Sequence, residues 1–133
     1  MVGVEGVGAA GLPQGPLELP RHGDPSLAIW QMLESITDPE IPVLSLREIG
    51  VLRAIRQTKQ ASWQVFITPT YIGCPALSQM ANDLQDRLQT EGIHAEVITS
   101  HAPAWSSDWI SPSGLDKLRQ YGIAPPGRSA TEP

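Results

Sequence analysis

The hydrophobic pattern changes period twice between residues 63 and 97, and this change restricts the folds open to the chain. Apolar residues alternate along 63–68 as in a strand, recur at helical spacing after Pro75, and return to period two along 93–97. Gly92 lies where the helix must end. The residues that carry the pattern are Trp63, Val65, Ile67, Leu77, Met80, Leu84, Leu88, Ile93, Ala95 and Val97.

Upstream of this segment the sequence predicts one more helix and one more strand. The helix begins at Asp24-Pro25-Ser26 and ends at Asp38-Pro39, and the strand covers roughly residues 51–56. The order α-β-β-α-β predicts an α+β fold, in which a small mixed three-stranded sheet packs with two helices. A C-terminal loop and a short helix from about Pro112 to Tyr121 follow.

Glycine and proline mark the ends of the predicted domain. Residues 1–23 are rich in both, and we expect a flexible arm there. Residues 24–126 form a single α/β domain, which fits a length of 133 residues, and residues 127–133 form a frayed tail.

Composition excludes several classes of function. The net charge is −5, and lysine and arginine occur singly, which disfavours a nucleic-acid binder. No apolar run approaches the length of a membrane span, and the N-terminus does not resemble a signal peptide. A single cysteine cannot form an internal disulfide, so we expect a cytoplasmic protein.

That cysteine, Cys74, lies in the stretch TPTYIGCP between a predicted strand and a predicted helix. A thiol in the first turn of a helix is favoured as thiolate by the positive end of the helix dipole. Thr68, Thr70 and Tyr71 can offer hydroxyl groups to a ligand at this corner. A buried structural cysteine is the other interpretation, and the residues alone leave both open.

Two further kinds of chemistry are conceivable at Cys74. A cysteine hydrolase or transferase needs a base, and His101 with Asp38 could complete a triad, although no spacing requires it. Structural zinc is disfavoured because no paired CxxC or HxxxH spacing exists. Asp38 and Glu40 could offer oxygen ligands to a shared, transient metal site, or could serve only to form a turn.

Trp105 and Trp109 are spaced four residues apart near the C-terminus. Core packing is the default interpretation of such a pair, and an aromatic surface for a partner protein is the alternative.

Two motifs together resemble a known family. ITDPEIPVLSLREIGVLRAI at 36–55 and TPTYIGCPALSQM at 68–80 resemble the small domain shared by SufT-like and cytosolic iron–sulfur assembly proteins. HAPAWSSDWISPSGLDKLRQYGIAPP at 101–126 is similar to the PaaD-like branch of the aerobic phenylacetate pathway. The resemblance covers about residues 25–126.

The resemblance implies a small α/β domain whose relatives help to assemble or insert iron or iron–sulfur clusters. The acidic position of the family falls on Asp38, with Glu40 beside it, and its reactive cysteine falls on Cys74. Thr68, Thr70, Tyr71 and His101 are then supporting residues, and Trp105 and Trp109 a partner surface.

The expected function is that of an accessory maturation factor for the multicomponent phenylacetyl-CoA epoxidase. Its cargo is transient iron or an iron–sulfur cluster, and its partners are epoxidase subunits, iron–sulfur assembly proteins or a second copy of the chain. PaaD-like proteins usually continue into a cysteine-rich segment, whereas this sequence ends at PPGRSATEP, so we expect no tight cofactor. The alternatives are a structural subunit of the epoxidase and a cysteine-dependent hydrolase or transferase.

Overall fold

The computed structural model describes residue 12 and residues 23–71 and 73–122. Three strands form one sheet in the order β1-β2-β3. They are β1 (Leu52–Gln57), β2 (Trp63–Ile67) and β3 (Ala95–Thr99). β1 pairs with β2 antiparallel and β2 with β3 parallel, so the predicted mixed sheet and the α+β class are confirmed.

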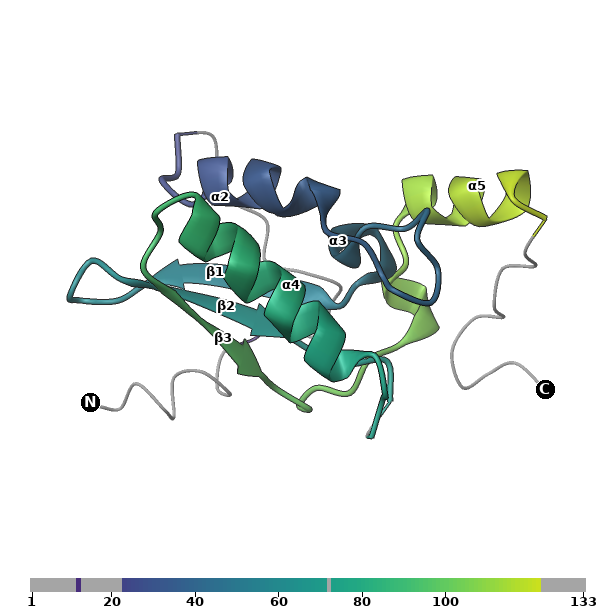
Figure 1. Cartoon of the computed structure of the whole chain (residues 1–133). Coiled ribbons are helices and arrows are strands. Elements are labelled where there is room, and N and C mark those ends of the chain that lie inside the picture. Colours follow the sequence, from purple (N-terminus) through teal and green to yellow (C-terminus); the bar gives the residue numbers. More distant parts are fainter. Residues whose placement is uncertain (1–11, 13–22, 72, 123–133) are drawn as a thin grey trace.

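Helices α2 (Leu27–Met32) and α4 (Leu77–Thr90) lie over one face of the sheet (Figure 1). A 3₁₀ turn, η1 (Leu33–Ser35), continues α2. The main core lies between the helices and the sheet, and the apolar stripe of α4 enters it at Met80, Leu84 and Leu88. The change from period two to helical period thus marks the side chains that build the core.

Helix α3 (Leu46–Ile49) lies between the predicted helix end at Asp38-Pro39 and the strand predicted from residue 51, where the sequence analysis placed no helix. Ser45 and Glu48 form a capping box, in which Ser45 Oγ accepts from Glu48 N and Glu48 Oε1 accepts from Ser45 N, both at 3.0 Å. Gly50, at φ 88°, ends the helix. The spacing S-x-x-E was therefore a usable signal for a helix start.

The C-terminal segment returns to the domain near α3. It contains the 3₁₀ turn η2 (Ser107–Trp109) and helix α5 (Pro112–Gln120), close to the predicted short helix. Pro112 occupies the first turn and Ser111 caps it by accepting from Gly114 N at 3.0 Å.

The face of the sheet away from α4 carries a second, smaller apolar cluster. Leu12, Ala54 and Phe66 are buried there, and Ile98 packs against them. Leu12 is thus packed although it belongs to the segment predicted as a flexible arm; the other residues of that segment up to 22, and the predicted tail after 126, lie outside the described residues. No helix among the described residues is long and apolar enough to cross a membrane.

Candidate metal-handling site

The cysteine loop, residues 68–71 and 73–76, joins the end of β2 to α4. Figure 1 shows it at the same end of the sheet as the segment that precedes α3. Gly73 takes φ 83°, Cys74 N donates to Tyr71 O at 3.2 Å, and Leu77 N donates to Cys74 O at 3.1 Å.

The helix after the cysteine begins later than predicted. Ala76 is the N-cap residue of α4 and Leu77 its first residue, whereas the sequence placed the start at Pro75. Pro75 and Ala76 form a turn, because Leu77 N bonds to Cys74 O three residues back. Cys74 therefore precedes the first turn of α4 rather than lying in it.

The Cys74 thiol is free and only 7% of the residue is exposed. It belongs to the main core cluster, beside apolar residues such as Ala76 and Met80. The one thiol of the chain thus lies at the edge of the core, under a loop that is itself exposed at Tyr71 and Gly73.

Tyr71 connects the cysteine loop to the acidic loop, residues 38–44. Its pKa is raised by partial removal from water, then by the charges of Cys74 and Glu40, and by a side-chain hydrogen bond with Cys74. The side chain is nevertheless 53% exposed. Tyr71 is therefore the side chain on which the charges of both Cys74 and Glu40 act.

Asp38 organises the acidic loop. Its Oδ1 accepts from Glu40 N at 2.7 Å and from Ile41 N at 3.2 Å, and its own N donates to Leu44 O at 3.0 Å. A carboxylate that accepts from backbone N–H groups two and three residues further along is typical of a turn-forming aspartate. Asp38 is also buried, at 5% exposure. These hydrogen bonds also fix where Glu40 lies.

The Thr68 hydroxyl forms its hydrogen bond with Arg53 rather than with another residue of the cysteine loop. Its Oγ1 accepts a hydrogen bond of 3.1 Å from Arg53 Nη1, and the guanidinium of Arg53 lies 3.9 Å from the centroid of the Trp109 ring. Successive side chains of a strand lie on opposite faces of the sheet, so residues two apart share a face. Thr68 is two residues after Phe66 and therefore lies on the same face as Phe66, away from α4. Thr70 is half-buried in the cysteine loop.

His101 follows β3 and is exposed. Ser100 N donates to Ile67 O at 2.8 Å, which places this segment beside the start of the cysteine loop. Within the described part of the chain, no hydrogen bond joins His101 to Cys74 or to Asp38, so the conceivable triad is not assembled there.

Trp105 and Trp109 differ in burial and in the groups that they contact. Trp109 is buried, and its Cβ and carbonyl group pack so closely on Gly50 that a Cβ there would be 2.7 Å from Trp109 Cβ. Trp105 is half-buried and its Nε1 donates to Ile49 O at 2.9 Å. Core packing describes Trp109 as observed, whereas Trp105 is only half-buried.

Arg53 and Glu48 were not singled out from the sequence. Arg53 is 0% exposed, and burial lowers its pKa. The sequence signal that could have indicated a buried arginine is the position of Arg53 inside the apolar run VLRAI. Glu48 accepts from Ser113 Oγ at 2.8 Å and from Lys117 Nζ at 2.9 Å, and so ties α5 to α3.

No group of three His, Cys, Asp or Glu side chains that could hold a metal ion occurs in residues 12, 23–71 and 73–122. The donors at the cysteine loop suit one thiolate ligand with a carboxylate nearby.

Comparison with known proteins agrees with this fold. The family model described as "Iron-sulfur cluster assembly protein" matches residues 27–97, which include Asp38, Glu40 and Cys74. A curated relative from Escherichia coli, named as a putative subunit of 1,2-phenylacetyl-CoA epoxidase, is 39% identical over 99 residues, or 74% of this chain. The chain spans 59% of that relative's length.

Two solved structures share the fold. A domain of unknown function from Bacillus anthracis has a TM-score of 0.63 at 24% identity, covering 69% of this chain and 89% of that one. A conserved hypothetical protein from Thermotoga maritima has a TM-score of 0.56 at 23% identity, covering 71% and 91%. By its sequence match over residues 27–97, the chain belongs to the iron–sulfur cluster assembly protein family.

Proposed function

We propose that this chain is an accessory maturation factor that passes iron or an iron–sulfur cluster to a phenylacetyl-CoA epoxidase. The observation that carries the proposal is the place of Cys74: the only thiol of an iron–sulfur assembly domain lies in the loop before α4, where Cys74 N donates to Tyr71 O at 3.2 Å. We take the epoxidase as the client because a relative of this chain is named as a putative subunit of that enzyme.

In this function the metal species is cargo. The Cys74 thiolate is a soft ligand that suits iron or a cluster, and a single such ligand releases its cargo readily. Glu40 lies close enough to interact with Tyr71 and can add an oxygen ligand or balance charge. The client, an assembly protein or a second copy of the chain completes the coordination.

The burial of Cys74 has a consequence for the transfer. At 7% exposure the thiol reaches a cargo only when the cysteine loop moves. Tyr71, which accepts a hydrogen bond from Cys74 N and is itself half exposed, is the side chain that we propose moves with the loop. Transfer in the cytoplasm, with the thiol kept reduced, is the setting of this proposal.

A structural subunit of the epoxidase is the second candidate, because Cys74 packs in the main core cluster. The third candidate, a cysteine hydrolase or transferase, lacks support from any hydrogen bond between His101 and Cys74 in the described residues.

The test is the assembly state of the epoxidase purified from cells with and without this protein. The maturation factor predicts that all subunits still associate without it, while their iron or acid-labile sulfide is deficient. A complex that is fully loaded but lacks a subunit or falls apart would favour the structural role. Turnover of a thioester or ester by the isolated chain, lost in Cys74→Ser, would favour the hydrolase.

A further inference from the structure

Strand β3 is the more exposed of the two outer strands of the sheet. The order β1-β2-β3 gives β1 and β3 one neighbouring strand each. In β1 the residues from Leu52 to Ile55 are buried, and the pairing register shifts between Leu52 and Ala54, as at a β-bulge. None of the residues Ala95–Thr99 of β3 is buried, and Figure 1 shows β3 at the edge of the sheet. Burial and bulges protect edge strands, so β1 is protected in two ways that β3 is not.

Two hydrogen bonds show which backbone groups of β3 face outward. Trp63 N donates to His94 O at 2.9 Å, and Ser100 N donates to Ile67 O at 2.8 Å, at the two ends of the parallel β2–β3 pairing. Successive residues of a strand direct their backbone N–H and C=O groups to opposite sides. Because His94 and Ser100 bond to β2, the backbone groups that point away from the sheet are those of the odd-numbered residues, Ala95, Val97 and Thr99.

These outward groups form a row of donors and acceptors without a partner strand. Gln85 Nε2 of α4 donates to Ala95 O at 3.0 Å. Within residues 12, 23–71 and 73–122, no hydrogen bond reaches the outward backbone N or O of Val97 or Thr99. The chemistry that matches such a row is an extended backbone, which adds a strand to the sheet.

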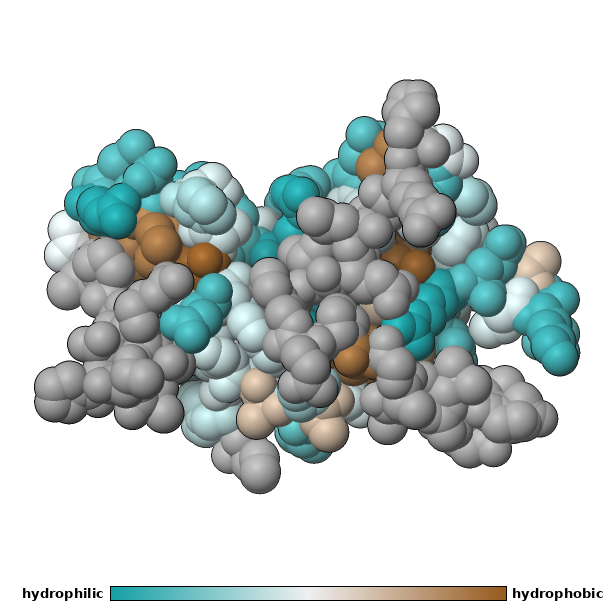
Figure 2. All heavy atoms as spheres, turned by 180° about the vertical axis from the view of Figure 1, so that it is seen from behind, coloured by the Kyte–Doolittle hydropathy of each residue, from teal (hydrophilic) through white to brown (hydrophobic). Residues whose placement is uncertain are grey.

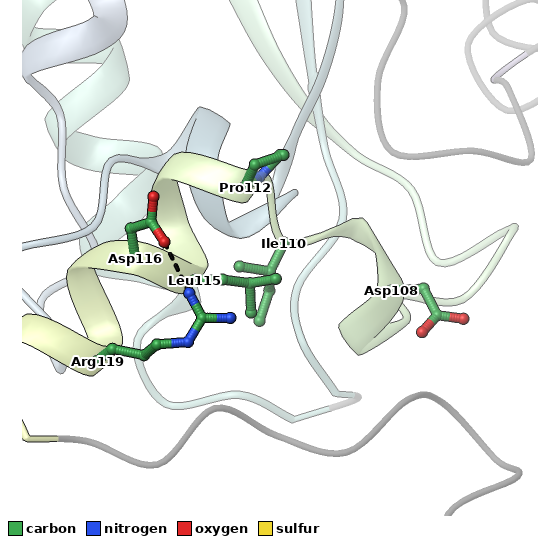
Figure 3. A pocket seen from close by; sticks show the side chains of 6 residues that line it. All are labelled: Asp108, Ile110, Pro112, Leu115, Asp116 and Arg119. Carbon is green, nitrogen blue, oxygen red and sulfur yellow. Dashed lines mark hydrogen bonds and ion pairs between the residues drawn. The ribbon is translucent and has the colours of Figure 1, made fainter.

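Other surface features of the described residues present their groups already paired. In the pocket of about 410 Å³ between η2 and α5, Asp116 is bonded to Arg119 at 2.7 Å. Asp108 has an interaction of its own and points away from the other lining residues (Figure 3). In the view from behind, the hydrophobic residues drawn in colour lie in separate patches bordered by hydrophilic ones (Figure 2). The backbone row of β3 is therefore the feature that most directly specifies a partner.

We propose that β3 pairs antiparallel with β3 of a second copy of the chain, so that the two sheets join into one continuous sheet. This inference is independent of the proposed function.

The sequence of β3 fits pairing with itself about Val97. With the two-fold axis at Val97, Ala95 lies opposite Thr99 of the second copy, and Glu96 lies opposite Ile98 of the second copy. All the outward-facing residues then form hydrogen-bonded pairs, and no like charges lie directly opposite each other. An axis at Glu96 would place two carboxylates directly opposite each other, which is unfavourable. Self-pairing about Val97 therefore satisfies both the backbone and the charges.

Helix α4 permits a second copy to approach this edge. A carbonyl oxygen has two lone pairs, so Ala95 O can accept from the second copy as well as from Gln85. Ala81 and Gln89 lie one turn before and one turn after Gln85, and both are uncharged. Two copies therefore bring no like charges together along this line of the helix.

The pairing places the two cysteine loops at opposite ends of the joined sheet. The bond from Ser100 N to Ile67 O sets the C-terminal end of β3 beside the start of the cysteine loop at Thr68. In an antiparallel pair this end lies beside the N-terminal end of the other β3. The second thiol is therefore remote from the first, and each copy presents its own Cys74 to a client or an assembly protein.

Sedimentation equilibrium of the full chain over a range of concentrations tests the pairing. Thr99→Pro removes the outward N–H of an exposed residue and leaves every N–H that bonds to β2 in place. Thr99→Val is the matched control, since it keeps this N–H and a β-branched side chain. Circular dichroism and melting temperature establish that both variants are folded.

We expect the wild type and Thr99→Val to dimerise with equal dissociation constants, in the micromolar range because the paired surface is small. The dimer of Thr99→Pro should be at least about tenfold weaker, since the two-fold axis removes two hydrogen bonds at once. A wild type that stays monomeric up to about 100 μM would overturn the proposal, as would equal dimerisation of Thr99→Pro and Thr99→Val. A monomeric wild type that binds epoxidase subunits more tightly than Thr99→Pro does would identify a client strand as the occupant instead.

A cross-link tests the register. Glu96→Cys and Ile98→Cys are prepared separately, each with Cys74→Ser, shown to be folded, and oxidised alone and as a mixture. Directly opposite residues of this kind have Cα atoms about 4.5 Å apart, which a disulfide can span, whereas diagonal neighbours at about 7–8 Å are too distant. We expect a disulfide-linked dimer in the mixture only. No link in the mixture, or equal linking of each variant alone, would overturn antiparallel pairing about Val97.

Discussion

The guanidinium of Arg53 lies 3.9 Å from the centroid of the Trp109 ring, so the sheet and the C-terminal segment meet at a buried cation–π contact. Arg53 also donates a hydrogen bond to Thr68 in the same place. The contact explains how a segment outside the family domain is fixed to β1, and the hydrogen bond from Arg53 to Thr68 links β1 to the start of the cysteine loop.

Replacing Trp109 by alanine should therefore destabilise the whole fold. We expect a loss of about 3–5 kcal/mol in the free energy of unfolding, typical of removing a buried tryptophan. Trp109→Phe keeps an aromatic face for Arg53 and should lose less. Urea unfolding followed by circular dichroism measures both; a loss below about 1 kcal/mol for Trp109→Ala would show that the ring is not part of the core.

Glu48 should make stability depend on pH in the acid range. Burial raises the pKa of its carboxyl, but hydrogen bonds from Ser45 N, Lys117 and Ser113 and the charge of Lys117 outweigh burial, so the pKa is lowered. A carboxyl with a lowered folded pKa stabilises fully above its unfolded value, about 4.3. This contribution is lost as the pH falls through the folded pKa.

Glu48→Gln tests the sign. At pH 7 the variant should lose about 1–3 kcal/mol, since charge-assisted bonds are removed from a nearly buried site. Below the folded pKa the wild-type carboxyl is protonated and the two proteins should converge. An unfolding free-energy difference that stays constant from pH 7 to strongly acid solution would contradict this assignment.

Two substitutions can separate the turn-forming role of Asp38 from the role of its negative charge. Asp38→Ala removes the acceptor for Glu40 N and Ile41 N and should cost about 1–2 kcal/mol, as for a lost helix or turn cap. Asp38→Asn keeps an oxygen at that position and should stay near wild-type stability. If the carboxylate serves the cargo, Asp38→Asn lowers iron loading of the epoxidase in cells at unchanged melting temperature; full loading would leave Asp38 a structural residue.

The Cys74 thiol should react slowly until Tyr71 is altered. At 7% exposure, native Cys74 should label more slowly than a cysteine in a short peptide. Tyr71→Phe removes the hydroxyl on which the charge of Cys74 acts and should speed labelling about two- to tenfold, the factor that one hydrogen bond to the thiol supports. Tyr121→Phe, at the other exposed tyrosine, is the matched control and should leave the rate unchanged. Equal rates in the two variants would remove Tyr71 from the site.

The elements that the sequence predicted well are those whose apolar side chains face a single core. The stripe of α4 required no knowledge of distant partners, because it is set by one buried face. Val65 and Ile67 of β2 likewise face the main core, although Phe66 between them is buried in the second cluster on the other face. The family motifs likewise placed Asp38, Glu40 and Cys74 in two loops, and the structure has them in the acidic loop and the cysteine loop.

What the sequence did not predict depends on tertiary contacts. Arg53 is a charged residue that is buried in β1, and the surface on which it stacks comes from Trp109, 56 positions further along the chain. Helix α3 is only one turn long, and its carboxylate cap is completed by Lys117 and Ser113. Leu12 is buried because the second face of the sheet offers Ala54 and Phe66, which no local pattern around residue 12 indicates.

The central claim is that the Cys74 thiol hands metal to the epoxidase. Iron and acid-labile sulfide should be measured in epoxidase purified from cells whose own copy of this protein is replaced by wild type, Cys74→Ser or the control Tyr121→Phe. Circular dichroism establishes that all three are folded. The account predicts full loading with wild type and Tyr121→Phe, and deficient iron or sulfide with Cys74→Ser. Full loading with Cys74→Ser would contradict it.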